Sequence, residues 1–124
     1  MKRLAVVIIA GLMSWGAWPS HATPPQFQII IESGSPYYLP ASAKVPTDSA
    51  IRWENPTASP HTITHDGCLT EEGPCVFDSG AIPPNGGYTL PGLPPGSYPY
   101  HCRLHPIMRG ILTVTEPIKS ASRI

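Results

Sequence analysis

The sequence predicts a small all-β sandwich of seven or eight short strands, and three observations lead to this prediction. The 124 residues include 17 prolines and 11 glycines, which argue against long helices through most of the chain. Short strand-like runs recur between turn signals, about every 8 to 12 residues. After the first 22 residues, no apolar repeat with the period of a helix is present.

The first predicted strands differ in how regular their patterns are. In residues 26–31, apolar and polar side chains mostly alternate, as in a strand with one buried face. Residues 38–45 form a second, irregular candidate. Residues 51–54 alternate again, so Ile51 and Trp53 are expected to face the core.

The remaining strands are predicted in the second half of the chain, between turns that are rich in proline and glycine. The candidate strands are residues 62–64, 76–79, 88–90, 98–101 and 111–115. The clearest turns are residues 83–87 and 91–96. In the last strand, Ile111 and Thr113 should lie on one side, and Leu112 and Val114 on the other.

The first 22 residues show the three regions of a secretory signal peptide. Lys2 and Arg3 form a positive start, residues 4–18 are almost entirely apolar, and residues 20–22 end the segment with small side chains at the cleavage positions. An uncleaved membrane anchor is the alternative, but an apolar run of about 15 residues is shorter than the roughly 20 that span a bilayer. We expect residues 1–22 to be a signal peptide and residues 23–124 to form a single exported domain.

The charge of the chain narrows the classes of partner. Eight basic residues face eight acidic ones, and two of the basic residues lie in the expected signal peptide. Neither a basic run nor a stripe of arginine and lysine is present, which argues against a nucleic-acid partner. No second apolar stretch follows the first, so no stable membrane insertion is expected after cleavage.

The three cysteines suggest one disulfide and one metal ligand. Cys68 and Cys75 lie in one short loop, and the oxidising surroundings of an exported protein favour a disulfide between them. A separate thiolate metal site is the alternative, although no histidine at zinc-finger spacing accompanies them. Cys102 would remain as a single thiol, either a buried structural cysteine or a metal ligand.

A soft thiolate, an imidazole and a thioether follow the strand that is expected to end at residue 101. Cys102, His105 and Met108 occur at three-residue intervals in a predicted loop, so one compact turn could direct all three side chains toward one ion. A second histidine from elsewhere in the chain would complete the set. Two imidazoles and a thiolate in a plane, with a weak axial thioether, form the ligand set of a blue copper site. Zinc could occupy such ligands, but the thioether favours copper.

The residues around this loop resemble those of the cupredoxins, the small blue copper proteins. The pattern N-x-x-x-x-P-H-T begins at Asn55, and the pattern C-x-x-H-P-x-M begins at Cys102. The ligand spacing is most similar to the amicyanin and pseudoazurin branch of the group that also includes plastocyanin. The resemblance covers residues 29–115. It departs at Leu104, where the family often has proline, and in the loop of residues 68–75.

The resemblance implies a Greek-key β-sandwich that binds one copper ion. The implied ligands are His61, Cys102, His105 and Met108. The resemblance also implies that Asn55 ties the first ligand loop to the loop that carries the cysteine, and such hydrogen bonds orient metal ligands.

Two further histidines compete with the implied ligands. His65 lies four residues after His61 on an expected strand, so it should sit further along the same face. His101 directly precedes Cys102 and should point to the opposite face. We expect neither of them to bind the copper ion.

The implied function is the transfer of single electrons, with copper cycling between Cu(II) and Cu(I). The protein would be exported, periplasmic and monomeric, and would dock transiently with a redox donor and a redox acceptor. An apolar collar near His105, formed by Pro106, Ile107, Pro83 and Pro84, would suit such docking. We expect no enzymatic activity, because nitrite or oxygen reduction needs an open coordination position or a second metal centre. A periplasmic copper carrier or sequestration protein that uses the same ligands is the alternative.

Overall fold

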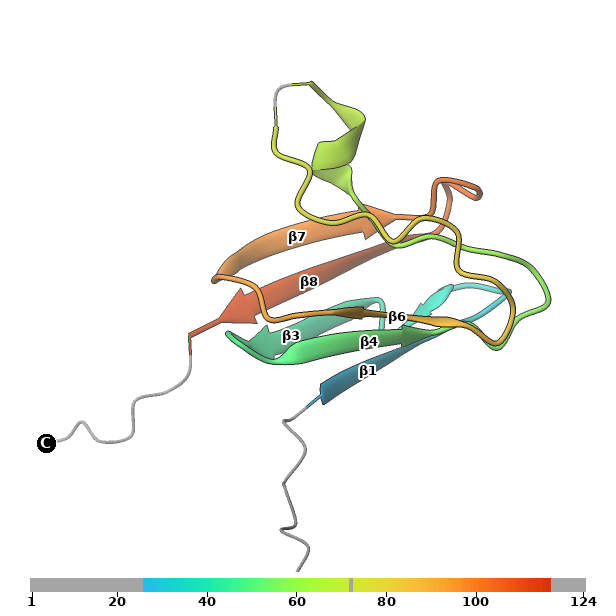
Figure 1. Ribbon diagram of the computed structural model, residues 1–124, viewed down its shortest axis with the longest axis horizontal. Helices are drawn as coiled ribbons and strands as arrows, with labels where there is room; N and C mark the ends of the chain where they lie inside the picture. The colour runs from blue at the N-terminus through green and yellow to red at the C-terminus, as the bar shows by residue number, and fades with distance from the viewer. Residues whose placement is uncertain (1–25, 72, 117–124) are drawn as a thin grey trace, which may run out of the picture.

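The computed structural model describes residues 26–71 and 73–116, which form two four-stranded sheets packed face to face (Figure 1). The expected signal peptide of residues 1–22 lies outside the described residues. Within the described ranges, no helix is long and apolar enough to cross a membrane. The predicted all-β sandwich is confirmed, because this part of the chain contains eight strands and one short 3-10 helix.

The strands alternate between the two sheets along most of the chain. In order, the elements are β1 (Gln26–Ile31), β2 (Tyr38–Leu39), β3 (Ser42–Pro46), β4 (Ala50–Glu54), β5 (Thr64–His65), the 3-10 helix η1 (Asp66–Leu69), β6 (Gly87–Leu90), β7 (Gly96–His101) and β8 (Arg109–Thr115). One sheet has the order β2-β1-β4-β6 and the other the order β3-β8-β7-β5. Every connection between β2 and β7 therefore crosses from one sheet to the other, as in a Greek-key sandwich.

The irregular segment 38–45 is divided between the two sheets instead of forming one strand. β2 pairs antiparallel with β1, whereas β3 pairs parallel with β8. Pro40 follows β2 directly and has no backbone N–H, so it cannot extend the hydrogen bonds of that strand. The chain then enters the opposite sheet two residues later.

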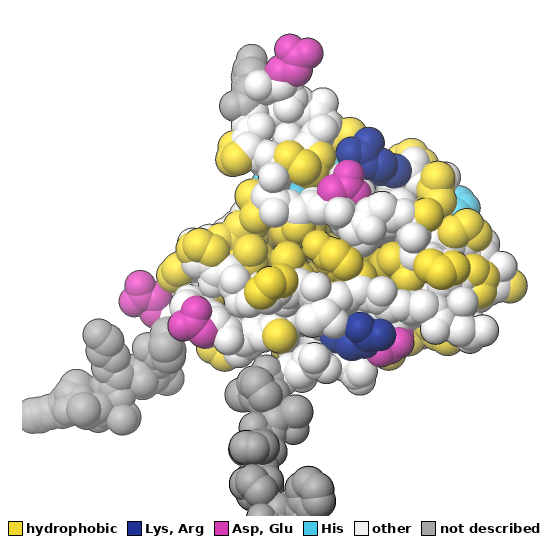
Figure 2. Space-filling model, viewed as in Figure 1, with side chains coloured by type: hydrophobic (Ala, Val, Ile, Leu, Met, Phe, Trp, Pro, Cys, Tyr) yellow, Lys and Arg dark blue, Asp and Glu magenta, His cyan; other side chains and the backbone are white. Residues whose placement is uncertain are grey.

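Residues 76–79, a candidate strand in the sequence, do not form a strand. They lie over the seam where β6 of one sheet adjoins β7 of the other. They form a single bridge, between Asp78 and Thr64, and the Phe77 carbonyl accepts a hydrogen bond of 2.9 Å from the His65 N–H. The buried Phe77 ring packs against Tyr98. On the face shown in Figure 2, apolar side chains gather along this seam between β6 and β7, and the charged side chains lie around its margin.

The core is built around aromatic side chains that meet between the sheets. Trp53 and Tyr100 are fully buried and lie edge to face, with ring centroids 5.5 Å apart. The Trp53 Nε1–H donates to the Tyr100 hydroxyl at 3.2 Å, and the Tyr38 hydroxyl donates to the Thr62 carbonyl at 2.9 Å. Burial raises the pKa of both tyrosines well above the ordinary value. The predicted inward orientation of Ile51 and Trp53 is confirmed.

Four connecting segments gather at one end of the sandwich, at the right of Figure 1. They are residues 32–37, 55–63, 79–86 and 102–108. Because loops carried by rigid strands are well placed to present functional side chains, this end is where the predicted ligands should meet.

Candidate metal centre

Strand ends position the four residues that the sequence singles out as ligands. Cys102 directly follows β7, and Met108 directly precedes β8. His61 lies before β5 and forms a bridge with Ile82, in which the His61 N–H donates to the Ile82 carbonyl at 3.2 Å and the Ile82 N–H donates back at 2.7 Å. His105 lies midway along the loop between β7 and β8. Two segments distant in the sequence are thereby brought to one place.

The structure brings together the side chains of His61, Cys102 and His105. The Cys102 Sγ lies 3.7 Å from the His105 Nδ1 and 4.0 Å from the His61 Nδ1. The three ligand atoms all lie within 4.8 Å of one another. With metal–ligand bonds of about 2.0 to 2.3 Å, two donors on one ion are separated by comparable distances. One ion therefore fits between these three atoms.

Met108 completes the neighbourhood from the same loop. Its side chain is buried and lines a cavity of about 250 Å³ together with His61 and His105. Two backbone hydrogen bonds close the loop: the Met108 N–H donates to the His105 carbonyl at 2.8 Å, and the Cys102 N–H donates to the Met108 carbonyl at 3.1 Å. The three-residue spacing thus becomes a closed turn with its side chains gathered at one place.

The Cys102 thiol is fully buried and receives one backbone hydrogen bond. The Thr62 N–H donates to the Cys102 Sγ at 3.3 Å. Such a donor stabilises negative charge on sulfur and limits how much electron density the sulfur gives to a metal. The chemistry of this donor set, a buried thiol with two imidazoles and a thioether, fits one copper ion.

Thr57 fixes which nitrogen of His61 faces the thiol. The Thr57 hydroxyl donates to the Asn55 Oδ1 at 2.6 Å, so its oxygen is free to accept a hydrogen bond from the His61 Nε2–H at 3.0 Å. This arrangement leaves the lone pair of the His61 Nδ1 on the side of the Cys102 thiol, free to bind a metal ion. Burial, and then the charge of His105, lower the pKa of His61 below its ordinary value, which favours the neutral imidazole that binds metals.

Asn55 braces a different part of the site from the part that the resemblance implies. Its Nδ2 donates to the carbonyls of Ser59, Ile82 and Pro83, at 2.9, 3.0 and 3.2 Å. Among the described residues, its hydrogen bonds stay within the His61 loop and the neighbouring segment 82–86. Asn55 therefore shapes the loop around His61 instead of tying it to the cysteine loop.

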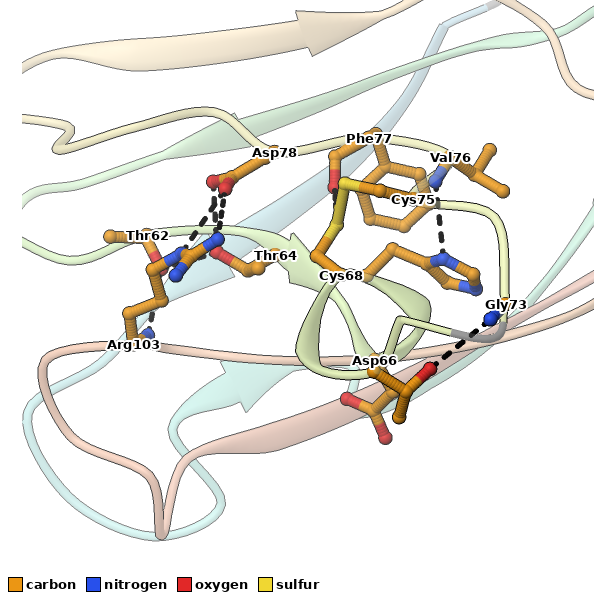
Figure 3. The surroundings of a disulfide bond; sticks show 12 residues. Thr62, Thr64, Asp66, Cys68, Gly73, Cys75, Val76, Phe77, Asp78 and Arg103 are labelled. Atoms are coloured by element: carbon orange, nitrogen blue, oxygen red, sulfur yellow. Dashed lines mark hydrogen bonds and ion pairs between the residues drawn. A yellow bond between two sulfur atoms is a disulfide. The ribbon is translucent and has the colours of Figure 1, made fainter.

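Thr62 makes the connection that was expected of Asn55. Besides its N–H bond to the Cys102 Sγ, its hydroxyl accepts a hydrogen bond of 2.8 Å from the Arg103 N–H (Figure 3). Sequence reasoning missed Thr62, although a hydroxyl residue directly after a candidate ligand is a signal worth weighing. Sequence reasoning also missed Thr57, because its side chain reaches His61 only after the loop has folded.

The two other histidines of this region have partners of their own outside the ligand group. The His101 Nδ1 lies 2.7 Å from the Asp66 Oδ1. The His65 Nδ1 accepts a hydrogen bond of 3.3 Å from the Val76 N–H, and its ring packs against Phe77. The predicted disulfide between Cys68 and Cys75 is present, and Cys102 is the free cysteine.

The low pKa of His61 predicts a pH dependence of the metal-free protein. Below the ordinary value of 6.5, the unfolded chain takes up a proton at His61 that the folded protein does not, so stability falls as the pH decreases. We expect the urea midpoint of the metal-free protein to fall between pH 7 and pH 5.5, and to fall less in His61→Gln. Equal pH dependence in the two proteins would contradict the expected role of His61.

Comparison with solved structures finds the same architecture in proteins of one group. A purple cupredoxin from Nitrosopumilus maritimus matches with a TM-score of 0.62 and 24% identity, over 72% of this chain and 99% of that chain. The Cu(I) form of a methionine-to-alanine variant of amicyanin gives a TM-score of 0.63 and 24% identity, over 75% of this chain and 85% of that chain. No family model and no curated protein matches the sequence. From the two mixed sheets, their Greek-key connections and these structural matches, we conclude that the chain has the cupredoxin fold.

Proposed function

We propose that this protein carries single electrons by means of one copper ion, bound by His61, Cys102, His105 and Met108. The observation that supports the proposal most directly is the buried Cys102 thiol with two imidazole nitrogens 3.7 and 4.0 Å away. When bound there, copper supplies one-electron chemistry by alternating between Cu(II) and Cu(I).

The described residues suit a site that changes little when an electron arrives. The Thr57 hydroxyl and the Ile82 backbone hold His61, while the closed backbone turn holds Cys102 and Met108. Thiolate and thioether sulfur suit Cu(I), and imidazole suits both oxidation states. Since these donors are fixed before the metal binds, little rearrangement is needed on electron transfer.

His105 offers the shortest route from the site to the solvent. It is exposed, whereas His61 and Cys102 are buried. Leu104 and Ile107 beside it are exposed apolar side chains, at 50% and 72%. We propose that this surface docks briefly with a redox donor and a redox acceptor, because small and partly apolar contacts suit transient redox complexes.

The remaining parts of the proposal concern location, assembly and catalysis. We propose that residues 1–22 direct export to the periplasm, that the domain acts as a monomer, and that it has no enzymatic activity of its own. Mass spectrometry of the secreted protein tests the first point: a product that begins at residue 23 supports it, and a product that retains residues 1–22 contradicts it.

The test of the function is the visible absorption spectrum of the purified protein loaded with Cu(II), followed by electron self-exchange. An intense thiolate-to-copper band with rapid exchange between the oxidised and reduced protein supports electron transfer. An intense band with slow exchange, and ready release of copper to a chelator, would favour the copper carrier. A pale spectrum at full copper occupancy would contradict the proposed ligand set.

A further inference from the structure

We propose that residues 66–71 and 73–78, here named the brace segment, hold the metal-binding loop in place, and that Asp66 and Asp78 are its positioning residues. The metal-binding loop is residues 102–108. Its function as a copper site rests on the proposal above, but the contacts of the brace segment are independent of any metal. Four side-chain contacts join the brace segment to Arg103 of this loop or to the strand residues that flank the loop, His101 and Arg109, and each of these residues is next to a proposed ligand.

Asp66 spans the base of the metal-binding loop. One carboxylate oxygen lies 2.7 Å from the His101 Nδ1, and the other accepts a hydrogen bond of 3.2 Å from the Arg109 Nη1. His101 precedes Cys102, Arg109 follows Met108, and the two residues are paired across β7 and β8. The carboxylate therefore joins the two strands where the loop leaves the sheet. His101 is almost fully buried, so the contact is partly shielded from water.

Asp78 holds the loop from its other side through Arg103, the residue after Cys102. The Arg103 Nε and Nη2 donate to the Asp78 Oδ2 at 3.1 and 2.7 Å. The Thr64 hydroxyl donates to the Asp78 Oδ1 at 3.0 Å, and it lies 2.8 Å from the Thr62 hydroxyl. Because the Thr62 hydroxyl accepts the Arg103 N–H, these hydrogen bonds form a closed ring that begins and ends at Arg103 (Figure 3).

The hydrogen bonds and the charge around Asp78 stabilise its ionised carboxylate. Burial alone would raise its pKa, but hydrogen bonds from the Gly80 N–H, Arg103 and Thr64, together with the charge of Arg103, hold the pKa below its usual value. Asp78 is therefore ionised at neutral pH. The contact with Arg103 is a charge-assisted one with two donors, the strong class of side-chain hydrogen bond.

A cavity lies between part of the brace segment and the metal-binding loop. The cavity of about 230 Å³ is lined by Leu69 of η1, by Pro106 of the loop, and by His101, Arg103 and Arg109. A volume of this size has room for several water molecules, since each occupies about 30 Å³ in the liquid. Removing the carboxylates would take away contacts that keep the loop from shifting into this space.

The disulfide keeps the two carboxylates at fixed positions. Cys68 and Cys75 close a ring that lies between Asp66 and Asp78 in the sequence (Figure 3). The ring is anchored next to β5, where the Val76 N–H donates to the His65 Nδ1. Closing the ring reduces the number of conformations open to this segment, so Asp66 and Asp78 face the loop without a large entropic cost.

The first test uses the metal-free protein and the reactivity of its one free thiol. Cys102 is fully buried, so a water-soluble thiol reagent reaches it only when the loop opens. We expect Asp66→Ala and Asp78→Ala to react roughly tenfold faster than the wild type. Asp66→Asn keeps an acceptor for His101, so its rate of reaction should fall between the rate of the wild type and the rate of Asp66→Ala. Glu71→Ala is the matched control, since it removes an exposed carboxylate from the same disulfide ring.

Global stability separates a local brace from a general loss of structure. The free energy of unfolding of each metal-free variant is measured in urea. Asp66→Asn or Asp78→Asn replaces the alanine variant at the same position if that variant does not fold. The proposal requires thiol reactivity to rise more than the change in global unfolding predicts. It is overturned if the Asp66 and Asp78 variants react like Glu71→Ala, or if global unfolding accounts for the whole increase.

The second test uses the copper-loaded protein. A positioning role predicts that the visible thiolate-to-copper band of the Asp66 and Asp78 variants shifts, and that copper dissociates roughly tenfold faster. An unchanged band and an unchanged dissociation rate in folded variants would overturn the proposal. If the wild type shows no such band while thiol reactivity changes as expected, the proposed function fails and the brace stands.

Discussion

Replacing Cys102 with serine is expected to abolish the intense visible band of the Cu(II) protein. That band is a charge-transfer absorption from a thiolate to the copper ion, and serine has no sulfur and does not ionise at accessible pH. We expect the visible intensity to fall by more than about tenfold at full copper loading, since the two imidazoles alone give a weakly coloured complex. Absorption and electron paramagnetic resonance spectra of the loaded variant measure the effect.

The substitution should leave the metal-free fold in place. Serine is close to cysteine in shape, and the Thr62 N–H that donates to the sulfur can donate to the hydroxyl oxygen instead. Near-ultraviolet circular dichroism of the metal-free variant provides the control for folding. Lys44→Gln is the control for an unrelated substitution, because Lys44 is an exposed residue of β3 outside the ligand residues, and it should keep the band. An intense band in Cys102→Ser would show that Cys102 is not the copper ligand.

The second large effect is expected from adding one methyl group at Gly110. Gly110 pairs with Tyr100 across β7 and β8, and a Cβ at this position would overlap the Tyr100 ring. That ring is held by Trp53 and Tyr38, whose centroids lie 5.5 and 4.8 Å from it, and its hydroxyl accepts the Trp53 Nε1–H. The ring has little room to move away, and moving it would leave a buried donor without its partner.

We expect Gly110→Ala to lower the free energy of unfolding of the metal-free protein by about 3 kcal/mol, from overpacking and a weakened buried hydrogen bond. For a domain of this size that corresponds to a decrease in Tm of roughly 12 to 24 °C. Gly34→Ala is the matched control, since no heavy atom lies within 4 Å of a Cβ at that position, and it should change stability by less than about 0.5 kcal/mol. Equal urea midpoints for the two variants would contradict the predicted overlap.

The sequence alone determined the features that depend on neighbours close in the chain. Alternation in residues 26–31 and 51–54 was enough to predict two strands and the buried face of the second. The three-residue spacing from Cys102 to Met108 was enough to predict that one loop gathers a thiol, an imidazole and a thioether. Two cysteines in one short loop were enough to predict the disulfide. Each of these patterns reports on side chains within a few positions of one another, where backbone geometry fixes direction and reach.

Only the tertiary structure decided which distant segments meet. It placed β2 and β3 in opposite sheets, and it assigned the link to the cysteine loop to Thr62 instead of Asn55. It also brought Asp66 to His101, 35 residues away along the chain. The sequence could not show these contacts, because a hydroxyl or a carboxylate can accept a hydrogen bond from many donors. Which donor arrives depends on how the strands pair and on how the sheets pack.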